Sequence, residues 1–371
     1  MKILIDLTSL ADNFSGIELY AQSVALQLIK NQNDKFILVF KNFIPKEFFI
    51  DYANVSFIVI KGKNKLFFNQ VLLPWRLRRV KADRYLFLAF TEPFLWFRKG
   101  TCNAIHDLSC WDCPGSNKWY MILYWKLSFL KVAYRKGIIF TVSNFSKDCI
   151  VNKLKVDENR VVVTYSAPSL QKQNILFSNS QENSVRKTYS LPNKYILSLS
   201  TIEPRKNLTL LLTAFSQLVI NNLSDVHLVI AGRKGWKTSK LLGNLPRDVL
   251  SKIHFTGFVK SDDLPYVYNM AELFVFPSLY EGFGVPPLES ILCKTMVLSS
   301  DANAMKEILG DNAIFFKNND IKDCISKVQY CLSLPIHKKE CFTKSALENI
   351  RSYSWSNVST LIDSCIHKNC R

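Results

Sequence analysis

The chain has 371 residues, of which 48% are hydrophobic and 13% aromatic, and its formal net charge is +18. This length exceeds the roughly 100–200 residues of a usual domain, so we expect two domains, and the apolar content excludes a disordered chain. The charge favours an anionic partner, which composition alone leaves open: nucleic acid, nucleotide phosphates or an acidic lipid surface.

The chain begins with MKILIDLTSL, which is typical of a first β-strand and unlike a signal peptide, because no long apolar run follows. The most apolar stretch, residues 85–97, is shorter than the roughly 20 residues that cross a bilayer, and it contains Glu92 and Pro93. We therefore expect no transmembrane helix, a cytoplasmic protein, and free thiols at the ten cysteines.

Cys110 and Cys113 have CxxC spacing, and His106 lies just before them. A zinc site needs a fourth ligand and usually a second ligand pair, and neither is evident. We interpret both cysteines as structural thiols and expect no metal site.

Along the first half, short apolar runs alternate with amphipathic stretches, a pattern typical of parallel sheets covered by helices. The predicted strands are residues 2–7, 35–40, 55–60, 137–143 and 159–165, and the predicted helices are 17–31 and 144–154.

Residues 169–190 are rich in Ser, Asn and Gln, and we predict that they form an interdomain linker. Alternation then restarts, with predicted strands at 194–200, 226–232, 253–258, 273–278, 295–300 and 313–316, and helices at 207–221, 261–271 and 303–310. The prediction is an α/β chain of two tandem Rossmann-like, doubly wound domains, 1–168 and 191–350, which face a central cleft. We expect residues 351–371 to form a helix that packs back toward the first domain.

The segment SLYEGFGVPPLES, residues 278–290, joins a predicted strand to a predicted helix. Glycines permit close approach of the backbone to a ligand, and a helix N-terminus at a strand end can bind a diphosphate. Glu289 can then reach a ribose, while Glu281 faces the group beyond the phosphates. Taken alone, both glutamates could equally be surface acids around a loop.

Arg205 and Lys206 follow another predicted strand, in TIEPRKNLTLL. Adjacent cations after a proline turn suit a diphosphate, because Arg binds as a fork and Lys as a point charge. Cations are disfavoured at a helix N-terminus, so we expect an anion to offset them.

These motifs, together with LVIAGRKGW, IHFTGFVKSDDLPYVYNMAELFVFPS and SSDANAMKEILGDNAIFF, resemble the C-terminal domain of retaining GT-B glycosyltransferases of family GT4, the glycosyl transferases group 1. The first half agrees: SGIELYAQSV resembles the family's first loop and helix, and AIHDLS its His-Asp segment. The resemblance covers nearly the whole chain. The segment EPRKN is most similar to the corresponding segment of mannosyltransferases of O-antigen and capsule assembly.

The resemblance implies hexose transfer from a nucleotide sugar with retained anomeric configuration. Residues 1–168 would bind the acceptor and 191–350 the donor. The implied catalytic residues are His106, near the reacting centre, and Glu281, on the sugar hydroxyls. The implied donor-binding residues are Glu289 on ribose, Arg205, Lys206 and the N–H groups of Gly284 and Val285 on the diphosphate, Phe258 and Val259 near the base, and Gly16 in the first loop.

Two departures from the family pattern shift these roles. Ser200 and Thr201 stand where many members have Gly-Arg, so Arg205 and Lys206 would make more of the contacts with the diphosphate. Gly16 is the single glycine of a first loop that has two in many relatives. The family needs no bound metal or other cofactor, and this sequence has no Asp-x-Asp at a plausible strand end.

Two basic, aromatic segments of the first half stand outside these motifs. Residues 61–81 contain seven Lys/Arg and residues 118–136 contain five, and neither contains an acid. Such segments bind anionic membranes, although ordinary solvated helices have a similar composition. A polyprenyl-diphosphate-linked oligosaccharide acceptor would explain them.

We therefore predict a hexosyltransferase of surface-polysaccharide assembly, peripheral on the inner face of the cytoplasmic membrane, with GDP-mannose or a UDP-sugar as donor. The alternatives are a soluble sucrose- or glycogen-synthase-like transferase and a non-enzymatic nucleotide-sugar or nucleic-acid binding protein. Nucleic acid is disfavoured because no binding motif accompanies the charge.

Overall fold

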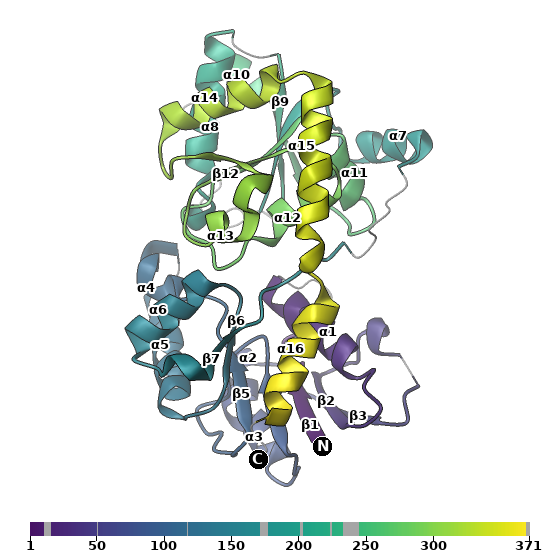
Figure 1. Cartoon of the computed structure of the whole chain (residues 1–371), viewed down its shortest axis with the longest axis vertical. Coiled ribbons are helices and arrows are strands. Elements are labelled where there is room, and N and C mark those ends of the chain that lie inside the picture. The colour runs from purple at the N-terminus through teal and green to yellow at the C-terminus, as the bar shows by residue number, and fades with distance from the viewer. Residues whose placement is uncertain are drawn as a thin grey trace. The chain divides into compact units, whose positions relative to one another are not determined.

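The structure is a computed structural model that describes residues 1–10, 16–49, 51–116, 118–170, 177–200, 203–222, 225–232 and 245–368 (Figure 1). The chain divides into two compact units. Unit 1 comprises Met1–Ala167 and Tyr353–Arg371, and unit 2 comprises Pro168–Ser352.

Unit 1 is built on a parallel sheet. Among its described residues seven strands pair in the order β3-β2-β1-β4-β5-β6-β7. They are β1 (Lys2–Asp6), β2 (Lys35–Lys41), β3 (Val55–Ile60), β4 (Arg84–Phe87), β5 (Thr101–Ala104), β6 (Ile139–Thr141) and β7 (Val161–Val163). Strands β1, β2 and β4 are largely apolar and buried, as expected of a parallel sheet that helices cover on both faces.

The helical elements of unit 1 include short turns beside longer helices. They are α1 (Gly16–Leu28), α2 (Lys65–Phe67), a π-helical segment (Phe68–Leu72), α3 (Leu73–Leu77), α4 (Ser109–Asp112), α5 (Trp119–Tyr134), α6 (Asn144–Leu154) and α16 (Trp355–Lys368). Helix α6 begins where Ser143 accepts a hydrogen bond from the Ser146 amide at 3.0 Å. The π-helical segment precedes Pro74, whose missing N–H cannot complete a regular α-helical turn.

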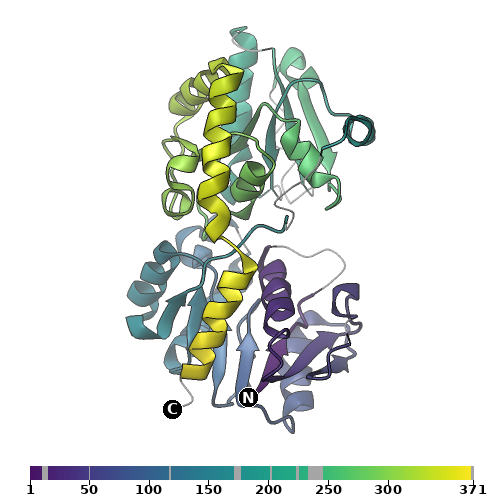
Figure 2. The ribbon, with the colours of Figure 1, turned by 45° about the vertical axis from the view of Figure 1, so that its right-hand side comes forward.

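Helix α16 returns to unit 1 after the chain has completed unit 2, and it lies along α1 (Figure 2). The Tyr20 and Trp355 rings pack edge to face with centroids 5.8 Å apart. Arg84, at the start of β4, donates from Nε to the carbonyl oxygen of Ile366 at 2.8 Å. Unit 1 is therefore assembled from two segments that lie far apart in the sequence.

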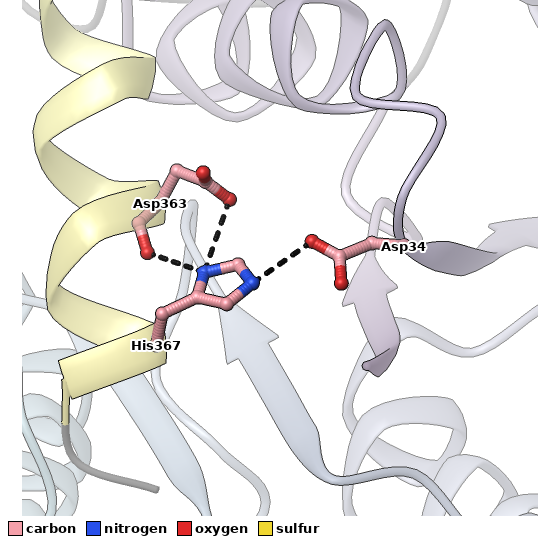
Figure 3. Close-up of side chains that lie close together, drawn as sticks. All are labelled: Asp34, Asp363 and His367. Atoms are coloured by element: carbon pink, nitrogen blue, oxygen red, sulfur yellow. Dashed lines mark hydrogen bonds and ion pairs between the residues drawn. The ribbon is translucent and has the colours of Figure 1, made fainter.

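Near its end, α16 is also attached to unit 1 through His367 (Figure 3). Its Nε2 lies 3.1 Å from Oδ2 of buried Asp34, which precedes β2. Its Nδ1 donates to the Asp363 carbonyl oxygen at 2.8 Å and lies 3.4 Å from the Asp363 carboxylate.

Unit 2 is built on a second parallel sheet, whose described strands pair in the order β10-β9-β8-β11-β12-β13. The strands are β8 (Tyr195–Leu199), β9 (His227–Ala231), β10 (Ile253–Gly257), β11 (Leu273–Phe276), β12 (Val297–Ser300) and β13 (Ile314–Phe316). The helices are α7 (Asn179–Thr188), α8 (Leu208–Ile220), α10 (Arg247–Ser251), α11 (Leu264–Asn269), α12 (Val285–Leu292), α13 (Met305–Leu309), α14 (Ile321–Ser333) and α15 (Ile336–Asn349). Leucines of α8 and apolar residues of α14 form the core on one face.

The predicted fold class is confirmed, since two units each contain a doubly wound parallel sheet. The predicted linker, 169–190, is wrong at its C-terminal end, because Asn179–Thr188 is helix α7 and contacts α11. Ser178 caps this helix, and Val185 is its one buried residue, so its composition resembles that of a loop. Residues 171–176 lie outside the described residues.

Strands β4 and β5 were not predicted. Strand β5 has the sequence TCNA and therefore no apolar run, and β4 overlaps the apolar stretch 85–97, which was considered only as a membrane segment. Among the described residues, no helix combines the length and the apolar character that crossing a membrane requires.

Candidate functional site

The candidate site of unit 2 lies where its sheet reverses direction. Strands β8 and β11 are neighbours, yet the chain runs from β8 through β9 and β10 on one side before it returns to β11. In open α/β sheets the carboxyl ends of strands at such a switch point are the usual ligand site. Here the two loops at this edge are joined by a hydrogen bond from the Leu279 amide to the Arg205 carbonyl oxygen, 2.8 Å long.

Arg205, Lys206 and Glu281 form an ion cluster at this edge. Lys206 Nζ donates to Glu281 Oε1 at 2.6 Å, and the Arg205 guanidinium donates to Oε2 at 3.2 Å. The Glu281 side chain is only 8% exposed. Glu203 accepts a second bond from the guanidinium at 2.9 Å, and the Phe276 ring lies 5.3 Å from Lys206 Nζ. The carboxylates of Glu281 and Glu203 thus offset the two cations, and binding of a diphosphate by these cations stays a prediction.

The cluster fixes the charge of its members. Burial alone would raise the pKa of Glu281, but the charges of Lys206 and Arg205 outweigh it and lower the pKa to about 2. Burial lowers the pKa of Lys206, and the neighbouring Glu281 opposes that shift. At neutral pH Glu281 is therefore an ionised carboxylate held between two cations.

Gly284 forms the entry to helix α12. Its φ is +86°, a conformation that L side chains rarely adopt. A Cβ there would also lie 2.5 Å from Cε of Met305, so the position suits glycine twice over. The next residues include Pro286 and Pro287, which have no N–H. Of the first N–H groups that a helix leaves without an intrahelical partner, only those of Gly284 and Val285 exist here.

Glu289, one turn into α12, belongs to a second network. Its Oε1 accepts hydrogen bonds from the amide of Ser169, at 3.2 Å, and from the Ser169 hydroxyl. The Tyr268 hydroxyl donates to Oε2 at 3.2 Å. Burial raises the pKa of Glu289, while the bonds from Ser169 and Tyr268 lower it less strongly.

Phe258 and Val259 follow β10 at the same edge of the sheet. The Phe258 ring is 52% exposed, whereas Val259 is buried. Their role toward a base stays a prediction.

In unit 1 the predicted residues Gly16 and His106 lie on different elements. Gly16 begins α1, which follows β1, and β1 and β4 are the switch point of that sheet. His106 follows β5, and its Nε2 contacts the Leu88 carbonyl oxygen at 2.9 Å, so Nε2 carries the hydrogen. Its ring also lies edge-on to Tyr20, 4.9 Å between centroids. Burial lowers the pKa of His106, and the Leu88 carbonyl opposes the shift.

Potential metal ligands gather at one place in the described residues: Asp34, Asp363 and His367. Asp34 Oδ2 accepts from Asn31 at 3.2 Å besides contacting His367, so ion pairing and hydrogen bonding account for this set. The nine cysteines that the described residues contain are free thiols, including Cys110 and Cys113.

Comparison with known proteins decides the family. Residues 180–347 match the family model described as glycosyl transferases group 1. O-antigen chain mannosyltransferase B of Escherichia coli is 32% identical over 289 residues, which are 77% of this chain and 74% of that protein. The chain belongs to the glycosyl transferases group 1.

Other relatives of this group 1 glycosyltransferase agree. The serotype-specific mannosyltransferase WbdA of Escherichia coli is 32% identical over 230 residues, 61% of this chain, although these span only 28% of WbdA. The structure of Anabaena HepE in complex with UDP and glucose superposes with a TM-score of 0.73 at 15% identity, covering 99% of this chain and 100% of HepE. The fold is therefore the GT-B fold that the sequence predicted.

The family match divides the predicted site residues of this group 1 glycosyltransferase. Residues 180–347 include Glu281, Glu289 and the other predicted donor-binding residues of unit 2, whereas Gly16 and His106 lie outside them. The structure brings Arg205, Lys206 and Glu281 into direct contact and gives Glu289 a network of its own.

Three residues of these networks were missed by the sequence analysis: Glu203, Tyr268 and Ser169. Glu203 could have been found, since it lies two residues before Arg205. Neither Ser169, which is 120 positions from Glu289, nor Tyr268, inside a helix of aromatic residues, carries a signal in one sequence.

Proposed function

We propose that this glycosyltransferase moves a hexose from a nucleotide diphosphate sugar, with retained anomeric configuration, to a polyprenyl-diphosphate-linked oligosaccharide of O-antigen or capsule. Mannose from GDP-mannose is the first choice of donor and a UDP-sugar the second. The names of the relatives, O-antigen chain mannosyltransferase B and WbdA, support the sugar and the pathway class.

The observation that carries the proposal is the buried ion cluster at the switch point of unit 2. A leaving diphosphate gains negative charge in the transition state, and cations that are already in position stabilise it without reorganisation. Ion pairs with Glu281 and Glu203 hold Arg205 and Lys206 in position. The N–H groups of Gly284 and Val285 add two neutral donors to the same diphosphate.

Glu281 serves both the cations and the sugar in this proposal. An ionised carboxylate has about four acceptor positions, and two of them receive Lys206 and Arg205. The remaining positions accept hydrogen bonds from sugar hydroxyls. Because its pKa is lowered to about 2, Glu281 stays ionised while it does so.

Glu289 binds the ribose hydroxyls. Ser169, which also donates to the Glu289 carboxylate, must then share this carboxylate with the ribose or move away from it. Both Ser169 donors now meet Oε1 of Glu289, while Oε2 receives only Tyr268 among the described residues. A ribose hydroxyl is a donor of the same kind as the Ser169 hydroxyl, so the two are interchangeable at this carboxylate.

The chemistry is a front-face displacement in which the leaving phosphate receives the acceptor's proton. A hydrolase would need two opposed carboxyls around the scissile bond, whereas one carboxylate, Glu281, serves the sugar here. His106 lies near the reacting centre and offers Nδ1 as an acceptor, since Nε2 donates to Leu88. Side-chain cations replace a metal ion, and the reaction needs no cofactor.

The acceptor places the enzyme at the inner face of the cytoplasmic membrane. Exposed Arg76, Arg78 and Arg79 lie in the basic segment 61–81, which contains α2 and α3 and is called the α2–α3 region, and they attract anionic lipid. We do not propose nucleic acid as a partner, although the net charge would also allow it.

The test is an assay of the purified protein with a panel of nucleotide sugars. We expect slow hydrolysis of one donor, faster transfer of its sugar to a polyprenyl-diphosphate-linked acceptor, and an unchanged rate with a chelator. Nuclear magnetic resonance of the product reports the anomeric configuration. No consumption of any donor, or an inverted product, contradicts the proposal.

A further inference from the structure

Helix α5 of unit 1 presents an apolar stripe to solvent. Its members recur every three or four residues and are 48–88% exposed: Tyr120, Leu123, Leu127, Leu130 and Tyr134. The opposite face buries Phe129 and Val132. A surface helix normally carries polar residues on its solvent face, and a helix that is apolar on both faces is typical of an apolar environment on both sides.

A neighbouring loop adds Leu95 and Phe97, which are 62% and 71% exposed. The loop is held against α5 by Lys131, whose Nζ donates to the Trp96 carbonyl oxygen at 3.0 Å, and by Arg135, which donates to the same oxygen at 3.1 Å. We call the α5 stripe with Leu95 and Phe97 the apolar ridge.

Three charged side chains anchor this loop from within. The Glu92 carboxylate is fully buried and lies 3.2 Å from both Lys131 Nζ and Arg135 Nε. The same two cations lie 5.4 and 5.8 Å from the centre of the Phe97 ring. The contacts that hold this loop do not require Leu95 and Phe97 to face solvent. Their exposure on an anchored loop therefore indicates a surface that contacts another molecule.

The charges on α5 itself have one sign, whereas the neighbouring helices α4 and α6 contribute the exposed acids Asp112 and Asp148. Residues 118–136 contain five Lys/Arg and no acid, and Glu92, the acid of the loop, is buried. Gln70 of the π-helical segment contacts α5 and the neighbouring loop, since it donates to the Tyr124 hydroxyl and accepts from the Phe94 amide, both at 2.8 Å.

This charge pattern selects the occupant. A second copy of the chain would bring two basic surfaces together, although the three-and-four spacing also suits a coiled coil. An anionic bilayer matches the charge, and Tyr120 and Tyr134 at the two ends of the stripe suit the headgroup level. We infer that α5 lies in the membrane plane and that the apolar ridge inserts into the headgroup–acyl boundary of an anionic bilayer.

The inference deepens the membrane location proposed above and rests on it. Attraction by arginines alone is screened by salt, whereas burial of apolar side chains is not. If the ridge inserts, part of the binding to an anionic membrane should therefore persist at high salt. Insertion would also orient unit 1 on the bilayer, because the axis of α5 would lie parallel to the membrane plane.

The experiment compares two variants that leave the net charge unchanged. Leu123→Gln/Leu127→Gln/Leu130→Gln removes the centre of the ridge, and glutamine keeps the helix propensity of leucine. The control Ile220→Gln/Tyr330→Gln/Ile336→Gln alters three exposed apolar residues of unit 2. Sedimentation with phosphatidylglycerol–phosphatidylcholine vesicles measures binding at low salt and at about 1 M NaCl, where the Debye length is about 3 Å.

We expect the native chain and the control to retain binding at high salt, and the ridge variant to bind at least about tenfold more weakly at high salt, given the apolar area removed. Equal high-salt binding by the ridge variant, or complete release of the native chain, overturns the inference. So does a native dimer that the ridge variant makes monomeric without any vesicle binding. Should the triple variant unfold, which its circular dichroism reports, Leu123→Gln alone gives the same test with a smaller loss.

Hydrolysis of the nucleotide sugar without vesicles is measured in parallel. Intact hydrolysis with salt-sensitive vesicle binding overturns the ridge alone. Ridge-dependent binding without any donor hydrolysis overturns the proposed function and leaves the ridge standing.

Discussion

The charged residues of the two units differ in where they find their partners. In unit 2, Arg205 and Lys206 are mostly buried and are held by carboxylates a few ångströms away. In unit 1, Arg76, Arg78 and Arg79 are exposed beside large apolar side chains. Buried, paired charges are fixed in one geometry, whereas exposed charges act over a distance and are screened by salt. Arginine thus stands in a paired, largely buried position in unit 2 and in exposed positions in unit 1.

The sharpest way to break this comparison is to remove a buried cation. Arg205→Ala and Lys206→Ala should each lower turnover by roughly 10²–10³-fold, the scale of losing one preorganised donor to developing charge. Binding of the nucleoside diphosphate should fall more than binding of the monophosphate. Steady-state kinetics and calorimetric titration measure both, with exposed Lys322→Ala of α14 as the control. Normal turnover in both variants would move the diphosphate site elsewhere.

The two glutamates of unit 2 should respond differently to Glu→Gln. Glu281→Gln should lower turnover by roughly 10²-fold, because the sugar ring changes most in the transition state. Binding of the bare diphosphate should stay almost intact, because glutamine keeps one acceptor oxygen for the cations and Glu203 still holds Arg205. Glu289→Gln should mainly weaken diphosphate binding, about tenfold, because ribose is bound alike throughout the reaction. Calorimetry beside kinetics with the full donor separates the two effects. The reverse pattern would mean that the donor binds in the opposite orientation.

The exposed arginines of unit 1 should matter for location more than for chemistry. Arg76→Glu/Arg78→Glu/Arg79→Glu should weaken binding to anionic vesicles at low salt at least about tenfold, because each basic residue near such a surface contributes about 1 kcal/mol. Donor hydrolysis in solution should stay unchanged. The control Lys322→Glu/Lys338→Glu/Lys344→Glu reverses as many exposed charges in unit 2. Equal losses in both variants would show a general charge effect.

Ser169 offers the smallest and most specific test. If ribose takes its place at Glu289, Ser169→Ala should leave diphosphate binding unchanged or strengthen it up to about fivefold, the value of one hydrogen bond of about 1 kcal/mol. Calorimetric titration measures the change. Binding that falls as far as in Glu289→Gln would mean that Ser169 supports the site and does not compete for it.

The sequence predicted the parts of the fold that depend on local patterns. Apolar runs identified most strands, and both Arg205 and Glu281 were predicted to follow the carboxyl end of a strand, although their direct contact was not predicted. The opposite holds for Ser169 and Glu289, whose contact depends on how the chain enters unit 2. Helix α7 was missed because it buries a single residue, Val185, and otherwise has the composition of a loop.

Which face of α5 is exposed could not be predicted from the sequence either. Its segment was recognised as basic and aromatic, but Leu123, Leu127 and Leu130 are as compatible with a buried face as with an exposed one. Only the packing of Phe129 and Val132 against unit 1 decides which face remains outside. A helix that is apolar all round has no periodicity from which its orientation could be read.

The return of α16 to unit 1 sets an order for biosynthesis. On the ribosome, residues 1–167 emerge long before Trp355, which packs on Tyr20 of α1. Until residues 353–368 have been translated, the nascent first unit lacks one of the elements that covers α1, while unit 2 already has all of its segments. A chaperone that binds exposed apolar surface would therefore find its target in the first-made part of the chain, and ribosome stalling within unit 2 would prolong that exposure.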